Sequence, residues 1–239
     1  SIHTPARSFY LFGLSESLFA ERAGVWMERG AEPLMGVTAK EGVLSVTLRA
    51  RAAEAEFLAG LEQRAAEFRA RFADELYSEN EWELERALAR ALLARGTSFS
   101  AAESCTGGLV LALLTGVPGV SAVLGRGYVT YSDAAKEELL GVPRATLAEH
   151  GAVSRETAEA MARGAARASG AELTLAVTGI AGPDGGSAAK PVGLVWFATA
   201  YRGVVHSAER RFPAFGREAI RRWAARTGLY LALRRLGAD

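Results

Sequence analysis

SFSAAESCTGG, residues 98–108, joins a run of small and apolar residues to a polar loop that contains two glycines. The run predicts a short buried strand, and the loop predicts a turn into a helix from about Thr106. A strand that ends in such a loop and continues as a helix is typical of α/β domains. The segment therefore predicts a layered α/β sheet with a polar loop at the end of this strand.

The same alternation continues toward the C-terminus. Further strands are expected over residues 123–131, 172–179, 193–203 and 204–212, and further helices from Asp133, over residues 152–170 and from Arg217 to Arg235. The last two strands follow each other closely, which predicts an antiparallel hairpin near residues 193–212. Together the elements predict a layered α/β/α domain with a largely parallel sheet.

The preceding residues follow a different pattern. The expected elements are an extended segment from Ser8 to Gly13, a helix from Glu16 to Arg29, strands over residues 34–39 and 43–52, a helix within residues 52–77, and a helix from Glu81 to Arg95. Ser15 is a candidate N-cap, and residues 40–42 suit a hairpin turn. Hydrophobic periodicity stops at Tyr77. We therefore expect a small α+β domain over residues 1–77 and the α/β domain over residues 78–239.

The composition is typical of a globular protein, with 49% hydrophobic and 23% charged residues among 239 and a net charge of +1. This balance points to neither nucleic acid nor an anionic membrane, and the arginines within residues 52–77 alternate with acids, which favours a solvated face. The apolar runs are too short to span a membrane, and no signal peptide is visible. The single cysteine, Cys105, excludes an internal disulfide and favours the cytoplasm.

The loop AESCTGG is the first candidate site, because ligands of α/β sheets bind at the carboxyl ends of strands. Free N–H groups at the start of the expected helix can hold a phosphate or a developing oxyanion, and they belong to Cys105, Thr106, Gly107 and Gly108. Ser104 stands directly before them, where an attacking hydroxyl would belong. The residues alone leave open that Ser104 only caps the helix.

A serine hydroxyl needs a base to remove its proton. The histidines His3, His150 and His206 lie in no supporting motif, so each is expected to be an ordinary polar residue. A Ser-His-Asp triad therefore has no support in the sequence.

Residues 129–140, VTYSDAAKEELL, offer a lysine as the base. Tyr131 is expected at a strand end, Ser132 or Asp133 as a helix cap, and Lys136 in the first helical turn, facing outward. Helix dipoles and partial desolvation would lower the lysine pKa, as a base requires, and Tyr131 would relay the proton or bind the leaving group. A solvated Lys136 without a catalytic role stays open as the alternative.

A third loop, TGIAGPDGGSAAKPVGLVW, covers residues 178–196. Its glycines and prolines permit unusual backbone angles and close approach to a ligand, so we expect Thr178 and Gly179 to contact substrate and Lys190 to be a candidate anion contact. A long structural turn is an equally open interpretation. No cluster of His, Cys or carboxylates has metal-ligand spacing, so no metal site is expected.

Four segments together resemble a known family. AESCTGG, GYVTYSDAAKEELLGVP, EHGAVSRETAEAMARGA and TGIAGPDGGSAAKPVGLVW have the order and spacing of the CinA C-terminal domain family, also called PncC, the nicotinamide-nucleotide amidases. The resemblance covers about residues 80–239. It implies deamidation of nicotinamide mononucleotide to nicotinic acid mononucleotide and ammonia, in pyridine-nucleotide salvage, by a homo-oligomer, expected to be a dimer, without cofactor or metal.

The resemblance also implies residue roles. The family's serine, tyrosine and lysine fall on Ser104, Tyr131 and Lys136, as nucleophile, relay and base. The family's Phe-x-Gly-Asp-Arg segment corresponds to RFPAFGREAIRR, which has no Asp before Arg217. Arg217 and Arg221 are expected as anion contacts for the substrate phosphate, with solvated helix arginines as the alternative.

Residues 1–77, with FGLSES at 12–17, resemble the middle domain of full-length CinA proteins. The N-terminal domain of those proteins, similar to molybdopterin-cofactor biosynthesis proteins, has no counterpart here. The chain is therefore expected to be part of a longer protein, without the ADP-ribose hydrolysis associated with that domain. The alternative function is a non-catalytic nucleotide-binding or interaction module linked to competence or DNA damage.

Overall fold

The computed structural model describes residues 4–237, and the chain divides into two compact units between Glu83 and Leu84. Each unit contains its own sheet. This boundary comes later in the sequence than the one expected after residue 77. The reason is that β4 (Leu76–Ser78) pairs with β1 (Ala6–Phe12) and so belongs to the first sheet.

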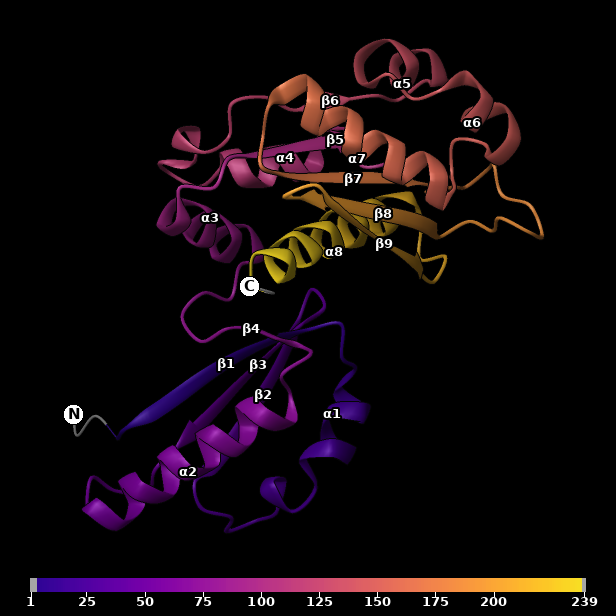
Figure 1. The fold of residues 1–239 in the computed structure, drawn as a ribbon. Coiled ribbons are helices and arrows are strands. Elements are labelled where there is room, and N and C mark those ends of the chain that lie inside the picture. Colours follow the sequence, from indigo (N-terminus) through magenta and orange to yellow (C-terminus); the bar gives the residue numbers. More distant parts are fainter. Residues whose placement is uncertain (1–3, 238–239) are drawn as a thin grey trace. The chain divides into compact units, whose positions relative to one another are not determined.

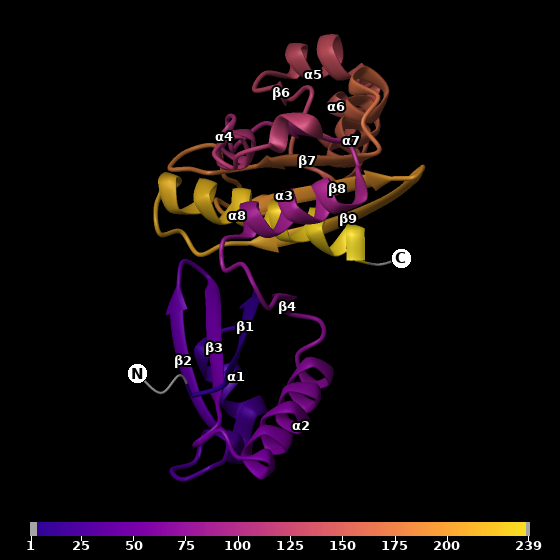
Figure 2. The same ribbon diagram turned by 90° about the vertical axis from the view of Figure 1, so that its left-hand side faces the viewer.

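The first unit is a four-stranded antiparallel sheet in the order β2-β3-β1-β4, with helix α2 packed beside it (Figure 2). Its remaining elements are α1 (Glu16–Ala23), the 3₁₀ helix η1 (Gly24–Met27), β2 (Leu34–Lys40), β3 (Val43–Arg49) and α2 (Ala55–Arg71). The pairing of β2 with β3 confirms the expected hairpin. Its core contains a group of aromatic rings among aliphatic side chains, in which Phe9 of β1, Phe19 of α1 and Phe68 of α2 are buried together.

Helix α1 begins as the sequence predicts but ends earlier. The Ser15 hydroxyl accepts the N–H of Leu18, so the predicted N-cap is confirmed. The helix stops at Ala23 instead of Arg29, because Gly24 has a φ of 53° and leaves the helical conformation.

The second unit is built on a five-stranded sheet in the order β6-β5-β7-β8-β9 (Figure 1). Its elements are α3 (Leu84–Arg95), β5 (Phe99–Glu103), α4 (Leu109–Thr115), the 3₁₀ helix η2 (Val120–Ala122), β6 (Tyr128–Val129), α5 (Asp133–Leu140), α6 (Arg144–His150), α7 (Arg155–Ser169), β7 (Leu173–Gly179), β8 (Leu194–Tyr201), β9 (Val204–Arg211) and α8 (Arg217–Gly237). The α/β class is therefore as expected.

The sheet is mixed, however, and not largely parallel. Strand β5 pairs in parallel with β6 and β7, whereas β8 pairs antiparallel with β7 and with β9. The cause is the connection after β7: residues 180–193 contain no helix to carry the chain back across the sheet, so β8 must run in the opposite direction.

Helices cover both faces of this sheet, which gives three layers. On β7, Thr174 donates its hydroxyl to the Ala162 carbonyl of α7, whereas Leu175 lies against Gly228 of α8. Successive strand residues point to opposite faces, so α7 and α8 lie on opposite sides of the sheet (Figure 1). Helix α5 packs on the α7 side, because Gly164 of α7 lies directly against the Leu140 carbonyl.

Local departures from the expected elements lie around the candidate loops. The expected strand over residues 123–131 is reduced to Tyr128–Val129, and the helix expected from Thr106 begins at Leu109. Helix α6 was not expected. The parallel strands β6, β5 and β7 nevertheless have their carboxyl ends on the same side of the sheet, where the loops after them meet.

Candidate active site

Ser104 directly follows β5, and a backbone hydrogen bond holds it at the carboxyl end of this strand. Its N–H donates to the Val177 carbonyl of β7 over 2.9 Å, so the position of the residue is fixed by two adjacent strands. The side chain is only 8% exposed. Its hydroxyl oxygen accepts a hydrogen bond from Lys136 Nζ over 3.2 Å.

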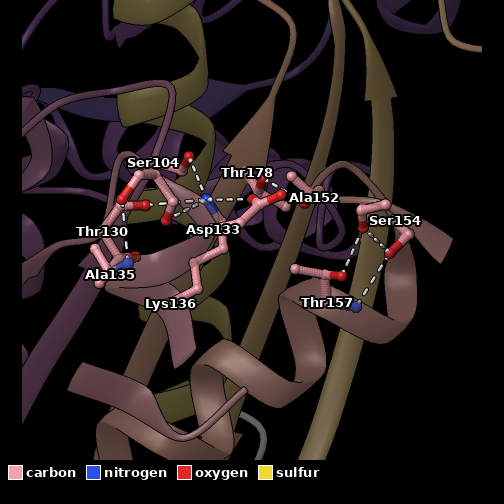
Figure 3. Close-up of polar contacts among 11 residues, drawn as sticks. Ser104, Thr130, Asp133, Ala135, Lys136, Ala152, Ser154, Thr157 and Thr178 are labelled. Carbon is pink, nitrogen blue, oxygen red and sulfur yellow. Dashed lines mark hydrogen bonds and ion pairs between the residues drawn. The ribbon is translucent and has the colours of Figure 1, made fainter. Parts of the chain in front are cut away.

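Lys136 is buried, with 1% of its surface exposed, so the expectation that it faces outward is wrong. Helix α5 begins at Asp133, capped by the Ser132 hydroxyl, and Lys136 shares a helix face with the core residue Leu140, four positions later. That face packs against α7. The ammonium is therefore directed inward, toward Ser104 (Figure 3).

The remaining partners of the Lys136 ammonium are few. Nζ donates to the Thr130 carbonyl over 3.0 Å and to the Ser132 carbonyl over 3.5 Å, and it lies 3.7 Å from Asp133 Oδ1 (Figure 3). Burial lowers the lysine pKa from 10.5, because the charged form loses its hydration, while the Asp133 carboxylate opposes the shift. A buried lysine that contacts a serine hydroxyl and has a lowered pKa can act as a general base.

The turn after Ser104 has few free N–H groups. The buried Glu103 carboxylate accepts the N–H groups of Gly108, Val110 and Leu111 over 2.9–3.1 Å and so caps helix α4. The Gly107 N–H donates to the Ser104 carbonyl. Of the four expected oxyanion donors, Gly107 and Gly108 therefore already have acceptors.

Cys105 and Thr106 are the two residues of this turn whose N–H groups donate to no backbone carbonyl within residues 4–237. Both residues are buried, and a buried N–H without a partner is costly, which suits a group that awaits a ligand oxygen. The Cys105 thiol is a poor nucleophile, because burial raises its pKa to about 12.

Tyr131 and Arg217 lie together, although they are far apart in sequence. Arg217 donates from Nη2 to the Tyr131 hydroxyl over 2.6 Å and from Nη1 to the Gly182 carbonyl over 2.7 Å. Tyr131 is 60% exposed, and among the described contacts its hydroxyl meets Arg217, not Ser104 or Lys136. Arg217 thus links the β6–α5 loop to the glycine-rich loop after β7.

The residues expected in the third loop have protein partners of their own. The Thr178 hydroxyl is buried and donates to the Ala152 carbonyl over 2.7 Å (Figure 3). A side chain at Gly179 would come within 2.6 Å of Val195, so glycine is needed there for the pairing with β8. Lys190 donates to the His150 carbonyl.

Two further residues shape the site. Glu103 was not identified from the sequence, although an acidic residue just before a helix start is a capping signal. Arg221 donates from Nε to the Cys105 carbonyl over 3.2 Å and from Nη2 to the Thr106 carbonyl over 2.8 Å. It therefore contacts the loop that carries Ser104.

The described histidines lie outside this group of residues. His150 ends α6 and His206 lies on β9, while His3 falls outside the described residues. Across residues 4–237, no three His, Cys, Asp or Glu side chains are grouped as metal ligands. In the same range, no helix has the length and apolar character that crossing a membrane requires.

The chain is similar to several known proteins. A CinA-like protein of Geobacter sulfurreducens is 45% identical over 237 residues, which cover 95% of this chain and 55% of that protein. The nicotinamide-nucleotide amidohydrolase PncC of Enterobacter agglomerans is 50% identical over 153 residues, 64% of this chain and 93% of that protein. The chain spans about half the length of the longer curated relatives.

Solved structures and a family model agree with these similarities. The crystal structure of the competence/damage inducible protein CihA from Agrobacterium tumefaciens matches with a TM-score of 0.62 at 50% identity, covering 64% of this chain and 93% of that one. The model of the CinA C-terminal domain matches residues 81–236, most of the second unit. The chain therefore belongs to the CinA C-terminal domain family.

Proposed function

We propose that the second unit is an amidohydrolase that converts nicotinamide mononucleotide and water to nicotinic acid mononucleotide and ammonia. The observation that carries the proposal is the 3.2 Å hydrogen bond between buried Lys136 and Ser104, together with the lowered lysine pKa. The choice of substrate is supported by the name of the Enterobacter agglomerans relative, which is similar across this unit.

In the first step, neutral Lys136 accepts the proton of the Ser104 hydroxyl. The serine oxygen forms a bond to the carboxamide carbon, and the carbonyl electron pair moves to oxygen. The N–H groups of Cys105 and Thr106 would hydrogen-bond the resulting oxyanion. The step requires the uncharged lysine, which burial favours.

In the second step, the carbonyl re-forms, the carbon–nitrogen bond breaks, and nitrogen receives the proton held by Lys136 and leaves as ammonia. Water then attacks the acyl-serine, gives a proton to Lys136, and the serine oxygen leaves and regains its proton. Tyr131 is proposed as the relay for the proton that reaches the leaving nitrogen: its hydroxyl, which accepts from Arg217, would donate its own hydrogen to that nitrogen and take the proton of Lys136 in return.

The same proposal includes substrate contacts. Arg217 lies at the exposed start of α8 beside Tyr131, where a guanidinium can attract the substrate phosphate. Thr178 and Gly179, at the end of β7, are proposed to contact the substrate. We further propose a cytoplasmic dimer acting in pyridine-nucleotide salvage. The unpaired Cys105 is compatible with a reducing compartment, and light scattering of the purified protein would test the dimer.

The test is ammonia release from nicotinamide mononucleotide by the wild type and by Ser104→Ala. Loss of the nucleophile should lower the rate by at least about a thousandfold. Ser100→Ala is a matched control, because Ser100 is a buried serine of β5, the strand that Ser104 follows, and its hydroxyl has no partner among the described residues. The rate of this variant should stay near that of the wild type.

The result can also refute the proposal. Equal ammonia release by the wild type and Ser104→Ala, or none by either, would contradict it. Nucleotide binding without turnover would instead favour the non-catalytic module.

A further inference from the structure

The Arg221 guanidinium donates hydrogen bonds to two backbone carbonyls and forms no ion pair with a carboxylate among the described residues. It lies on α8 and donates to the carbonyls of Cys105 and Thr106 over 3.2 and 2.8 Å. Within the described part of the chain, no Asp or Glu lies at ion-pair distance from it, whereas its neighbour Arg222 pairs with Glu218 on the surface.

The contact fixes the direction of a neighbouring N–H group. In a planar trans peptide, the C=O and the N–H point in opposite directions. The Cys105 carbonyl belongs to the peptide that carries the Thr106 N–H, so holding the carbonyl toward α8 turns the N–H away from α8. That is the side of the sheet where α5 carries Lys136.

The second N–H is fixed by the turn itself. The Ser104 carbonyl, whose peptide carries the Cys105 N–H, accepts from the Gly107 N–H over 3.0 Å. Gly107 has a φ of 61°, and a side chain there would come within 3.3 Å of Arg221 Nη2, so glycine serves both the turn and the close approach of the arginine.

We propose that Arg221 is a positioning residue that holds the Thr106 N–H in the direction needed to bind the oxyanion of the reaction, beside the Cys105 N–H that the turn itself directs. It would act through this peptide and not by contact with the reacting atoms. This inference rests on the proposed amidohydrolase function. Both described contacts of Arg221 are with backbone carbonyls, so its expected role as an anion contact is the alternative that the experiment must separate from positioning.

Arg221→Ala tests the inference through the separation of kcat from KM. With nicotinamide mononucleotide, kcat should fall by about tenfold to a hundredfold, since oxyanion donors act on the transition state, while KM stays within about threefold. Nicotinamide riboside, which lacks the phosphate, should show the same fold-loss in kcat. Arg222→Ala, which removes the adjacent exposed arginine, should leave both parameters unchanged.

Two results would overturn the inference. An unchanged kcat in Arg221→Ala would do so, and so would a rise in KM confined to the phosphate-bearing substrate, which would make Arg221 a phosphate contact. If the alanine variant does not fold, Arg221→Lys keeps the charge but offers a single point donor, and its kcat should fall in the same direction. Added guanidinium ion at low concentration should partly restore kcat in a folded alanine variant.

A second readout separates this inference from the proposed function. Labelling of Ser104 by a fluorophosphonate places a phosphoryl oxygen against the same N–H groups and needs no amide substrate. If the wild type is labelled but releases no ammonia, the substrate proposal fails and the Arg221 inference can still be judged. Labelling should be slower in Arg221→Ala than in Arg222→Ala, and equal rates would contradict the inference.

Discussion

Lys136 carries the only ammonium group that contacts Ser104 in the described structure, and its environment sets the pH range of the proposed chemistry. Burial removes hydration from the ammonium and lowers its pKa from 10.5, whereas Asp133 at 3.7 Å favours the charged form. The uncharged amine is the base. The fraction of active enzyme should therefore increase as the pH rises through the lowered lysine pKa.

The first residue-scale prediction is the pH profile of kcat/KM. For the wild type, kcat/KM should rise with pH and reach half its plateau below pH 10.5. Asp133→Asn removes the carboxylate that favours the ammonium, so the midpoint should move to lower pH. The carboxylate is more than half exposed, so the pair is weak and the shift should be small.

The matched control for this profile is Glu137→Gln. Glu137 is the next carboxylate on the same helix, four residues after Asp133, and it pairs with Arg144, not with Lys136. Its removal should leave the midpoint in place. A midpoint that rises in Asp133→Asn, or that moves equally in the control, would show that Lys136 is not the titrating base.

At the scale of elements, the contact between α5 and α7 determines where the lysine lies. Gly164 of α7 has no room for a side chain, because a Cβ there would overlap the Leu140 carbonyl at the end of α5. Leu140 and Lys136 share one face of α5. A small residue on α7 therefore allows α5 to lie close enough for Lys136 to reach Ser104.

Gly164→Ala should thus weaken both stability and activity. Overpacking should lower the free energy of unfolding in urea by about 1–3 kcal/mol, despite the better helix propensity of alanine. Displacement of α5 should lengthen the Lys136–Ser104 contact and reduce kcat by about tenfold.

Gly60→Ala is the control for helix propensity. Gly60 lies in α2 with open space at its Cβ position, so alanine should stabilise that unit by up to about 1 kcal/mol and leave kcat unchanged. If Gly164→Ala behaves like this control, close packing of α5 on α7 does not position the lysine.

At the scale of the whole molecule, the candidate site lies within one unit. Ser104, Lys136 and Arg221 all belong to the second unit, and so do Tyr131 and Arg217. The Enterobacter agglomerans relative is matched across 93% of its length by 153 residues of this chain. The second unit should therefore hold every group that the proposed reaction needs.

A chain that begins at residue 81 tests this expectation. Because domains with their own core fold independently, its kcat and KM for nicotinamide mononucleotide should lie within about twofold of those of the full chain. Circular dichroism would establish that the shortened chain is folded. A folded but inactive second unit would show that the first unit contributes to catalysis.

Several local features could be predicted from the sequence because their causes are local. The Ser15 cap, the hairpin of β2 and β3 and the strand–loop–helix order around Ser104 each depend on a few neighbouring residues. The motif resemblance likewise depends on residue order alone, and the family match confirms it. The roles of Ser104, Tyr131 and Lys136 stay predictions until activity is measured.

Other features depend on contacts between residues distant in sequence. The Lys136 side chain was expected to face solvent but is buried, because packing decides which face of α5 lies against α7. The same is true of the direction of β8, which depends on its pairing with β7. Tyr131 contacts Arg217, and Arg221 donates to the turn after Ser104, although the residues of each pair are far apart in the sequence.

The sequence by itself determined which groups are present and the order in which strands, loops and helices follow one another, since capping, turn chemistry and hydrophobic period act over a few residues. Only the tertiary structure decided which of these groups touch. Burial and side-chain direction are set by the packing of α5, α7 and α8 around the sheet, and that packing makes Lys136, not Tyr131, the partner of Ser104.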